Sequence, residues 1–404
     1  MRLKTASIFL LSSLLISLSG FEYREGKTTI RTTAQRASTH LNLPNIPSSG
    51  YVSEWKIRQD SLFDFNRGFL ETAIEASIRP QSSQNLSLPS GAGAGVNPAT
   101  AFEIKDLDWN GGGSLNARLR LDRFSYSKDF GPYTFTLGRQ AITLGKGNSF
   151  SVLDVLNPFS PQSLDATYKP GIDALRIEKI IGDTGGMEII ITSGSNQKRE
   201  NIIGKYRKLV GRVDTELILG EFRQRKMAGL SLEGEISDLG VLTELGLIER
   251  DMLSDAYFNG GGNYALAAVL GLTKRLSTED TVSLSYLYHE LGAKNLNQLN
   301  QGFFHGPLTD KWLWNSSRQY LRFSLIKKLD SLKTLLSSLQ YNLEDESVFF
   351  QPGISYNLAS NLDLSVFAWK GFGKQSQISP AGIIRQSEFG DTSLGIGLFI
   401  KWVF

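Results

Sequence analysis

Cysteine is absent from the 404 residues of this chain, which removes disulfide bonds, zinc–thiolate sites and cysteine nucleophiles. The absence also suits an exported protein that must stay unfolded in an oxidising compartment. Beyond the first twenty residues, no apolar run is long enough to cross a bilayer as a helix, which excludes a helical membrane protein. An excess of one charge is missing too. The chain has 43 Lys and Arg residues against 40 Asp and Glu residues, which argues against a nucleic-acid partner.

Histidine is scarce, and this weakens the case for an enzyme. Only His40, His289 and His305 are present. Ser285 shares a predicted strand face with His289, but residues four apart on a strand are about 13 Å apart, too far for a nucleophile and its base. No metal-ligand spacing or phosphate-binding glycine loop is present. We therefore predict no catalytic residues, no metal site, no cofactor and no enzymatic activity.

The first twenty residues resemble a secretory signal peptide in composition. Arg2 and Lys4 precede an apolar stretch at residues 8–18, small residues follow up to Gly20, and residues 22–25 are charged. A run this short, followed so closely by charge, is a poor membrane-spanning helix. We therefore predict that residues 1–20 are a signal peptide and that the rest of the chain is exported.

The last twelve residues have the pattern of a membrane-spanning β-strand. Every even position from Leu394 to Phe404 is apolar, and a period of two places these side chains on one face of a strand. A strand of this length crosses a bilayer when it is tilted. A terminal strand that ends in an aromatic residue is typical of bacterial outer-membrane barrels. The barrel-assembly machinery recognises this terminal strand. Trp402 and Phe404 are the predicted assembly signal.

Alternating segments fill the chain between residues 68 and 404. We count sixteen, beginning with 68–79 and 114–126 and ending with 362–372 and 392–404. Short turns and long loops mostly alternate between them, as they do between the periplasmic and extracellular ends of a barrel. The prediction is an all-β fold, a transmembrane antiparallel β-barrel of about sixteen strands (14–18) with both termini in the periplasm. A closed barrel leaves no unpaired backbone groups in the bilayer.

Residues 21–67 lack a clear period of two. They are polar, and Pro44, Pro47 and Gly50 mark a linker within them. We predict a periplasmic N-terminal segment here, either ahead of the barrel or tucked into its lumen. The predicted domains are therefore 1–20, 21–67 and the barrel at 68–404.

The polar faces of the first predicted strands are charged. If the apolar faces contact lipid, these faces line an aqueous lumen, because sixteen strands are too many for side chains to fill the interior. Arginines on consecutive strands suit an anionic solute, since guanidinium groups bind carboxylates and phosphates in a bidentate manner. Alternatively, the charges only pair with one another along the wall. The predicted pore and constriction residues are Glu71, Glu75, Arg118, Arg120, Asp122, Arg139, Arg176 and Glu178.

The connection at residues 144–170 is the strongest candidate for a constriction. It is long and partly apolar, and Pro158 and Pro161 restrict its course. Such a loop can fold into a barrel and narrow it, or it can lie on the outer surface. Arg139 just before it needs a bulge, because strict alternation from Tyr133 would point its side chain toward lipid.

Residues 138–145, 154–158 and 169–176 resemble the corresponding segments of the alginate-export-type outer-membrane porins. The later hairpins and the aromatic terminus add to this resemblance. It implies a monomeric outer-membrane channel whose inward loop forms the constriction. Leu144 stands where an aromatic residue often occurs in the family, and sixteen strands are two fewer than in the alginate exporter. The residues that the resemblance assigns to the pore or to anchoring the loop are Arg139, Asp154, Lys169, Asp173 and Arg176.

Together these patterns predict an outer-membrane channel for the diffusion or export of small hydrophilic solutes. A more specific form of this prediction is a channel for anionic solutes. Its expected partners are outer-membrane lipid, the barrel-assembly machinery and a small polar solute, and a trimer stays open beside the monomer. The alternative is a surface-binding protein that uses the barrel as an anchor. Loops 80–113, 292–318 and 373–391 are long enough for that role.

Overall fold

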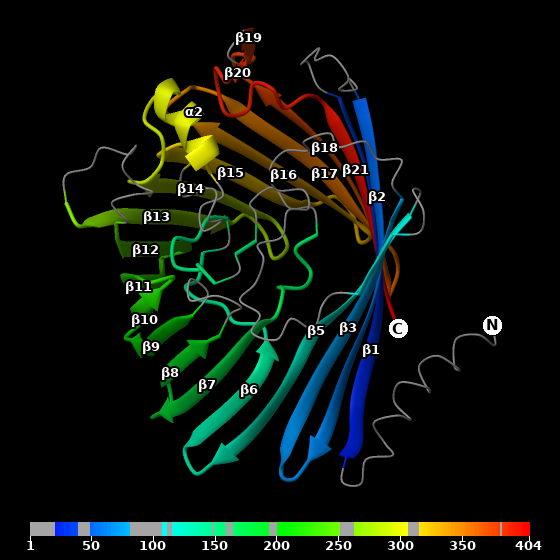
Figure 1. Cartoon of the computed structure of the whole chain (residues 1–404), viewed down its shortest axis with the longest axis vertical. Coiled ribbons are helices and arrows are strands. Elements are labelled where there is room, and N and C mark those ends of the chain that lie inside the picture. Colours follow the sequence, from blue (N-terminus) through cyan, green and yellow to red (C-terminus); the bar gives the residue numbers. More distant parts are fainter. Residues whose placement is uncertain are drawn as a thin grey trace.

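Eighteen antiparallel strands close into a barrel in the computed structural model (Figure 1). The sheet holds nineteen strands, and all of them except the short β4 (Leu107–Asn110) form the closed ring. The structure describes residues 21–38, 49–80, 107–110, 115–147, 149–156, 158–159, 165–193, 200–250, 262–305, 315–379 and 382–404. Among these residues, no helix has the length and apolar character needed to cross a membrane. The predicted signal peptide at 1–20 lies outside the described residues.

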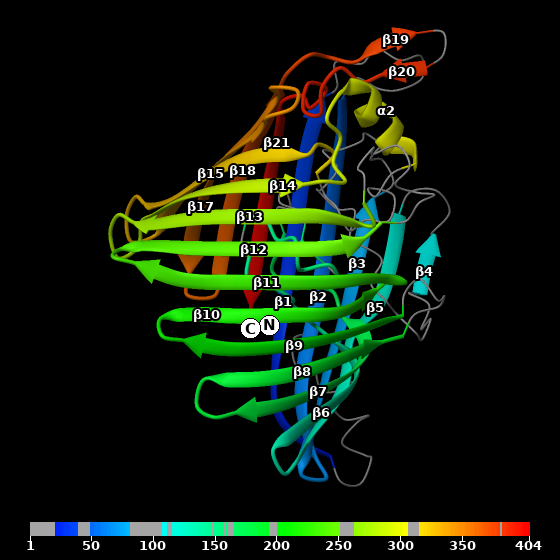
Figure 2. The same ribbon diagram turned by 90° about the vertical axis from the view of Figure 1, so that its left-hand side faces the viewer.

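The strands of the ring are connected in sequence order, each hydrogen-bonded to the next (Figure 2). They are β1 (Phe21–Ser38), β2 (Ser49–Phe65), β3 (Gly68–Pro80), β5 (Leu115–Phe130), β6 (Tyr133–Gln140), β7 (Ile172–Ile181), β8 (Gly185–Thr192), β9 (Asn201–Val210), β10 (Val213–Phe222), β11 (Arg225–Ile236), β12 (Leu239–Glu249), β13 (Tyr264–Arg275), β14 (Thr281–His289), β15 (Gln319–Lys328), β16 (Lys333–Asn342), β17 (Val348–Ala359), β18 (Leu362–Phe372) and β21 (Gly395–Val403).

The prediction of a periplasmic segment at residues 21–67 is wrong. Residues 21–38 and 49–65 form β1 and β2, and β1 closes the ring by pairing with both β2 and β21. Alternation is weak in β1 because, between residues 28 and 36, Thr28, Thr32, Ala34 and Arg36 share the outward face with only one large apolar residue, Ile30. In β2 the outward side chains include Trp55, 60% exposed, and Ile57, 52% exposed. These two strands raise the count from sixteen to eighteen, within the predicted range.

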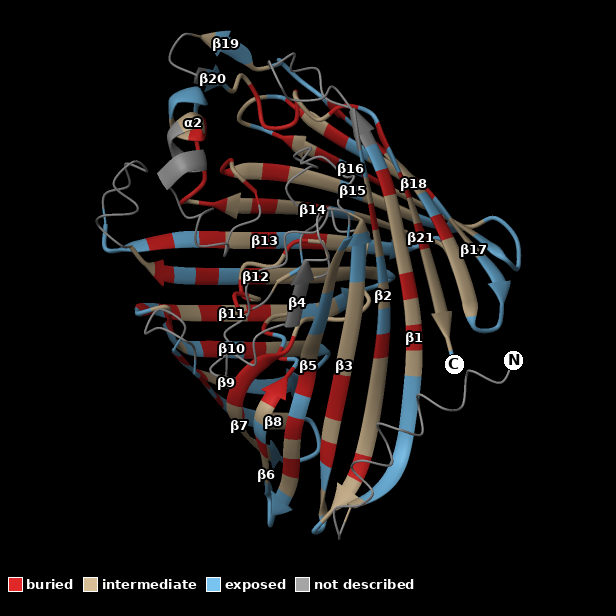
Figure 3. Cartoon of the chain, turned by 45° about the vertical axis from the view of Figure 1, so that its right-hand side comes forward, coloured by how far each residue is buried: buried red, intermediate tan, exposed pale blue. Residues whose placement is uncertain are grey.

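All sixteen predicted strands are present, with boundaries shifted by a few residues. In the last strand the even positions face outward as expected, since Leu394 and Ile396 are each 56% exposed, whereas Phe399 faces inward and is buried. Figure 3 shows the same alternation of buried and exposed residues along β10 to β13. Phe21 pairs with Phe65 beside the β2–β3 turn, and Asn361 in the β17–β18 turn bonds Val403, so both described ends of the chain lie at the end with the short turns.

The opposite end of the barrel carries longer connections. The helix α2 (Leu296–His305) lies between β14 and β15, and a separate hairpin is formed by β19 (Gln377–Ser379) and β20 (Gly382–Ile384). The two lie close together at the top of Figure 1. The Asn300 side chain joins them, because its amide donates to the Arg385 carbonyl and accepts from the Arg385 amide.

Deletion of residues 21–38 tests the closure. Without β1, the facing edges of β2 and β21 lose their partner, and unpaired backbone groups in a bilayer cost several kcal/mol each. We expect the deletion variant to lose the fast-migrating folded band of a barrel in unheated SDS electrophoresis. Deletion of residues 377–384 is the control, since β19 and β20 pair only with each other. A folded band that survives the loss of β1 would show that the ring closes in another way.

Candidate functional site

The connection between β6 and β7, residues 141–171, is called the inward loop below, and its described residues lie inside the barrel (Figure 1). Its anchor is the carboxylate of Glu244, which points inward from β12. The backbone amides of Lys146, Gly147 and Val152 donate to this carboxylate over 2.6, 2.8 and 3.0 Å, and the Ser151 hydroxyl donates over 2.8 Å. These bonds rule out the alternative of a loop on the outer surface.

Apolar contacts hold the same part of the loop. Leu153 is fully buried against Gly229 of β11 and Gly246 of β12, and a Cβ built at Gly229 would lie 2.4 Å from a Leu153 methyl carbon. Two glycines therefore make the space that this leucine occupies. The surrounding cluster joins loop and wall residues, among them Ile142, Leu144, Val155, Leu156, Ile190, Ile203, Ile218, Met227 and Ile248.

A second apolar cluster extends this contact toward β18. Phe150 of the loop packs against Tyr320, with ring centroids 6.4 Å apart. Tyr320 and Phe349 in turn contact Phe389, which lies in the connection before β21. Trp369 of β18 completes the group. Inward-facing apolar side chains on β8 to β18 are thus covered by the protein's own loops rather than by water.

The other leg of the inward loop meets a cluster of arginines, called the arginine cluster below: Arg31 of β1, Arg58 of β2 and Arg123 of β5. The guanidinium carbons of Arg31 and Arg58 lie 4.9 and 4.2 Å from the ring centroid of Tyr168. The Tyr168 hydroxyl lies 2.7 Å from Thr29 Oγ1, and Arg123 donates to the Lys169 carbonyl over 2.5 Å. β1 and β2 therefore hold the Tyr168 side chain, and β5 holds the backbone of the next residue of the loop.

Carboxylates balance the arginine cluster. Arg31 is paired with Glu75 and with Asp165 of the loop, Arg58 is paired with Asp60 and Asp122, and Arg123 lies 2.7 Å from Asp122. Asp122 also accepts the Gly171 amide over 3.1 Å. All three arginines are buried, with at most 5% of each residue exposed. The cluster is therefore a set of fixed dipoles inside the lumen rather than a patch of free positive charge.

Four of the predicted residues fix the ends of the inward loop. Lys169 donates to both carboxylate oxygens of Asp154 over 2.6 Å, which ties the two legs of the loop together. Arg139 forms a bidentate pair with Asp173 over 2.7 and 3.0 Å. Gly138 has a φ of +120°, a conformation that favours glycine, and it interrupts the alternation so that Arg139 is buried. The predicted β-bulge is not present, because β6 pairs with β5 and β7 without a register shift, and Arg139 is buried without one.

The remaining predicted pore residues divide into paired and more open groups. Arg176 pairs with Glu178 and Glu188 over 2.6 Å each, so here the charges pair along the wall as the alternative interpretation expected. Arg118 is exposed, and Arg120 is cross-strand partner of Glu75. Glu71 lies 4.0 Å from Arg123. None of these contacts reveals which solute the lumen admits.

Several important residues escaped the sequence analysis. Arg31 and Arg58 lie in residues 21–67, which the sequence predicts to be a periplasmic segment and not part of the barrel wall. Arg123 follows Asp122 directly, so strict alternation places it on the lipid face. A register shift opposite Ala73 and Ile74 turns both Asp122 and Arg123 inward, each 5% exposed. Two consecutive charged residues in an otherwise alternating strand were the available signal.

His289, the histidine of a predicted strand, has a buried side chain on β14, and its Nδ1 accepts a hydrogen bond from the Leu291 amide over 3.1 Å. No group of three or more His, Asp and Glu residues in the described part of the chain is arranged to hold a metal ion.

At the C-terminus, the Trp402 and Phe404 rings lie 4.2 Å apart, and Phe404 exchanges backbone hydrogen bonds with Thr28 of β1.

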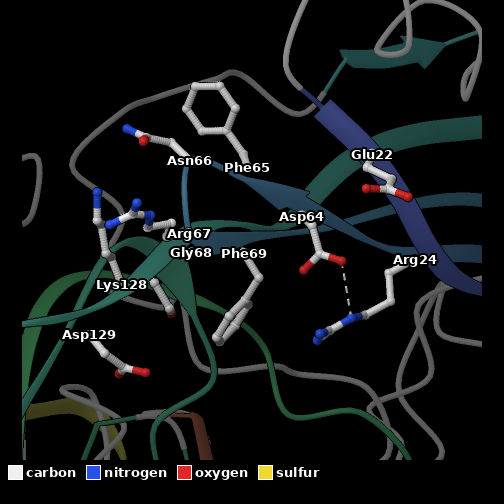
Figure 4. A pocket seen from close by; sticks show the side chains of 11 residues that line it. Glu22, Arg24, Asp64, Phe65, Asn66, Arg67, Gly68, Phe69, Lys128 and Asp129 are labelled. Atoms are coloured by element: carbon white, nitrogen blue, oxygen red, sulfur yellow. Dashed lines mark ion pairs between the residues drawn. The ribbon is translucent and has the colours of Figure 1, made fainter.

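A mixed-charge cavity of about 510 Å³ lies at the end of the barrel with the short turns (Figure 4). Residues from β1, β2, β3 and β5 line it, and Arg24 pairs with Asp64 over 3.3 Å at its wall. Arg67, Lys128 and Asp129 add charges of both signs. This end of the lumen is therefore polar and shows no selection for one sign of charge.

No family model matches this chain, and no curated protein matches it either. Solved structures do match in fold. OccK5 (OpdH) of Pseudomonas aeruginosa aligns with a TM-score of 0.57 at 6% identity over 94% of this chain and 98% of its own. OccAB4 of Acinetobacter baumannii aligns with a TM-score of 0.55 at 10% identity over 95% of this chain and 98% of its own. The fold is therefore that of a porin-type outer-membrane β-barrel.

Glu244→Gln tests the anchoring of the inward loop. The amide keeps the size of the side chain but has one acceptor oxygen in place of two charged ones, so we expect a loss of about 1–3 kcal/mol in loop docking. Limited proteolysis of the refolded barrel should then cut within residues 141–171. Glu233→Gln is the control, because this exposed carboxylate on β11 forms no bond to the loop among the described contacts. Equal resistance of Glu244→Gln and the native protein would contradict the anchoring role.

Proposed function

We propose that this protein is a channel of the bacterial outer membrane that passes small hydrophilic solutes by diffusion, with a preference for anionic ones. The observation that carries the proposal is the arginine cluster. Two guanidinium groups, of Arg31 and Arg58, lie over the Tyr168 ring, and Arg123 donates to the neighbouring Lys169 carbonyl, where the inward loop meets the wall of β1 to β5. These buried groups hold the loop at the wall and so fix the passage that a solute takes beside it.

The surfaces of the barrel support this function. Large apolar side chains face outward, for example Leu137 at 65% exposed and Ile202 at 60% exposed, as contact with lipid requires. The inward faces of β1 to β7 instead carry arginines and carboxylates. Opposed charges held in a low-dielectric wall create a field across the lumen, which favours hydrated polar solutes over apolar ones.

Anion preference follows from the chemistry of the donors rather than from net charge. A guanidinium group keeps five N–H donors, and one carboxylate partner does not use all of them. At most 5% of Arg31, Arg58 and Arg123 is exposed, so a passing carboxylate or phosphate can reach donors only on the more exposed arginines. Arg118, Arg120 and Arg176 on β5 and β7 provide such donors, with Glu75 and Glu178 as counter-charges of Arg120 and Arg176. Asp154, Lys169, Arg139 and Asp173 hold the loop that narrows the passage.

The remaining assignments belong to the same proposal. Residues 1–20 direct export, the end with the short turns faces the periplasm, and lipid surrounds the barrel. The barrel-assembly machinery reads the terminus at Trp402 and Phe404. The channel is a monomer without catalytic activity. The resemblance to alginate-export-type porins supports this group as the nearest family, and eighteen strands remove the difference in strand number noted from the sequence.

The test is single-channel recording of the refolded protein in a planar bilayer, with the reversal potential measured under a salt gradient. We expect steady openings, and Arg58→Gln should lower the anion-to-cation permeability ratio by about twofold. Lys274→Gln is the matched control. It also removes one positive charge from a wall strand, β13, where Lys274 pairs with Asp238 over 3.0 Å, but 48% of its side chain is exposed, and no described contact joins it to the inward loop.

A folded barrel that never conducts would overturn the channel. It would favour the surface-binding alternative, in which the connections at the end with α2 bind a partner. The observation that favours this alternative is the pair of hydrogen bonds by which Asn300 orders α2 relative to the β19–β20 hairpin.

A further inference from the structure

Arg322 of β15 differs in its contacts from the arginines that surround the inward loop. It lies between Ser285 of β14 and Gln340 of β16 in the register of the sheet. Ser285 is 7% exposed and Gln340 is 1% exposed, whereas the adjacent Phe323 is 44% exposed on the outer face. Arg322 therefore faces the lumen, two residues along β15 from Tyr320, which Phe150 of the inward loop contacts.

Neutral groups alone contact this guanidinium. Nη1 donates to Gln340 Oε1 and Nη2 donates to Ser338 Oγ, each over 3.2 Å. Nε is buried and has no hydrogen-bond partner. No carboxylate of the described residues forms an ion pair with Arg322, whereas Arg31, Arg58, Arg123, Arg139 and Arg176 each have at least one.

Arg322 is partly buried, and a partly buried cation without a charged partner favours an anion beside it. Burying a charge without a partner is costly, and arginine does not escape the cost by losing its proton. The surrounding inward-facing residues of β14 to β16 are hydroxyls and amides that carry no charge. They include Ser283, Ser285, Ser324, Ser338 and Gln340, the first four being donors as well as acceptors. An anion beside Arg322 would meet N–H and O–H donors.

The space favours a small anion. Nε has no accessible surface, so an anion can approach only the Nη side of the guanidinium, where Gln340 and Ser338 are themselves buried. A bulky organic solute would have to displace these side chains, whereas a monatomic ion needs only a small space lined by N–H and O–H donors. We propose that Arg322, together with the serine hydroxyls beside it, binds chloride as a resident counter-ion in the wall of the lumen.

The site has a consequence for the lumen. With chloride bound, this wall is neutral and hydrogen-bonded. Without chloride, it carries an uncompensated positive charge opposite the arginine cluster. Occupancy therefore sets the charge of the wall. The binding does not depend on whether the barrel conducts, so it can be tested separately from the channel.

The experiment is thermal unfolding of the refolded barrel in detergent, followed by the loss of its fast-migrating band. Sodium chloride is compared with sodium isethionate, a bulky anion, at equal ionic strength. A ligand that binds only the folded state raises its stability by mass action. We expect chloride to raise the midpoint of the native protein by about 2 °C, and Arg322→Gln to abolish this difference. Lys274→Gln should keep it.

An equal chloride effect in the native protein and in Arg322→Gln would overturn the site, as would no chloride effect in either. Arg322→Lys keeps a cation there and should retain part of the difference. If Arg322→Gln does not refold, broadening of the chloride NMR line by the native protein gives a second measurement. Broadening that Arg322→Lys weakens supports the site, and no broadening by the native protein excludes it.

Discussion

Closure of the backbone hydrogen bonds is the constraint on which the rest of this structure depends. An unpaired strand edge in a bilayer has no water to bond with, so the sheet must end where it begins. Here the strand that meets this need is β1, which pairs with β2 on one side and β21 on the other. It carries few large apolar residues, so its place in the wall is secured by its neighbours and not by its own contact with lipid. The aromatic terminus at Phe404 is fixed by the same pairing, through Thr28.

A ring of eighteen strands is too wide for its own inward side chains to fill. The inward loop occupies part of this interior through two different kinds of contact. Against β8 to β18 it packs as a core does, with Leu153 seated over two glycines and Phe150 against Tyr320. Against β1 to β5 it packs through charge, with Tyr168 held by arginines whose carboxylates are already in place. The apolar contacts and the four bonds to Glu244 fix the loop, and this fixes the position that Tyr168 can take.

The sequence predicted the barrel because lipid imposes a period of two on long strands, and the sixteen strands with such a period were found. It failed for β1, whose outward residues are mostly small or polar. It could not place Arg123, because a register shift reverses the face on which a side chain lies. The pairs of Asp154 with Lys169 and of Arg139 with Asp173 were accessible through motif resemblance. The arginine cluster was not, since Arg31, Arg58 and Arg123 are far apart in the chain and meet only after the ring closes.

Charge in this lumen is organised by distance between partners rather than by total number. Around the inward loop each arginine of the cluster lies beside a carboxylate, so removal of one partner exposes the other and changes the local field more than the overall balance suggests. On the wall of β14 to β16 the polar residues are hydroxyls and amides, and a single cation there dominates the potential. A solute between the two walls would thus meet paired dipoles on one side and a neutral surface with one charge on the other. The transverse asymmetry, set by which strands carry acids, is what the proposed selectivity depends on.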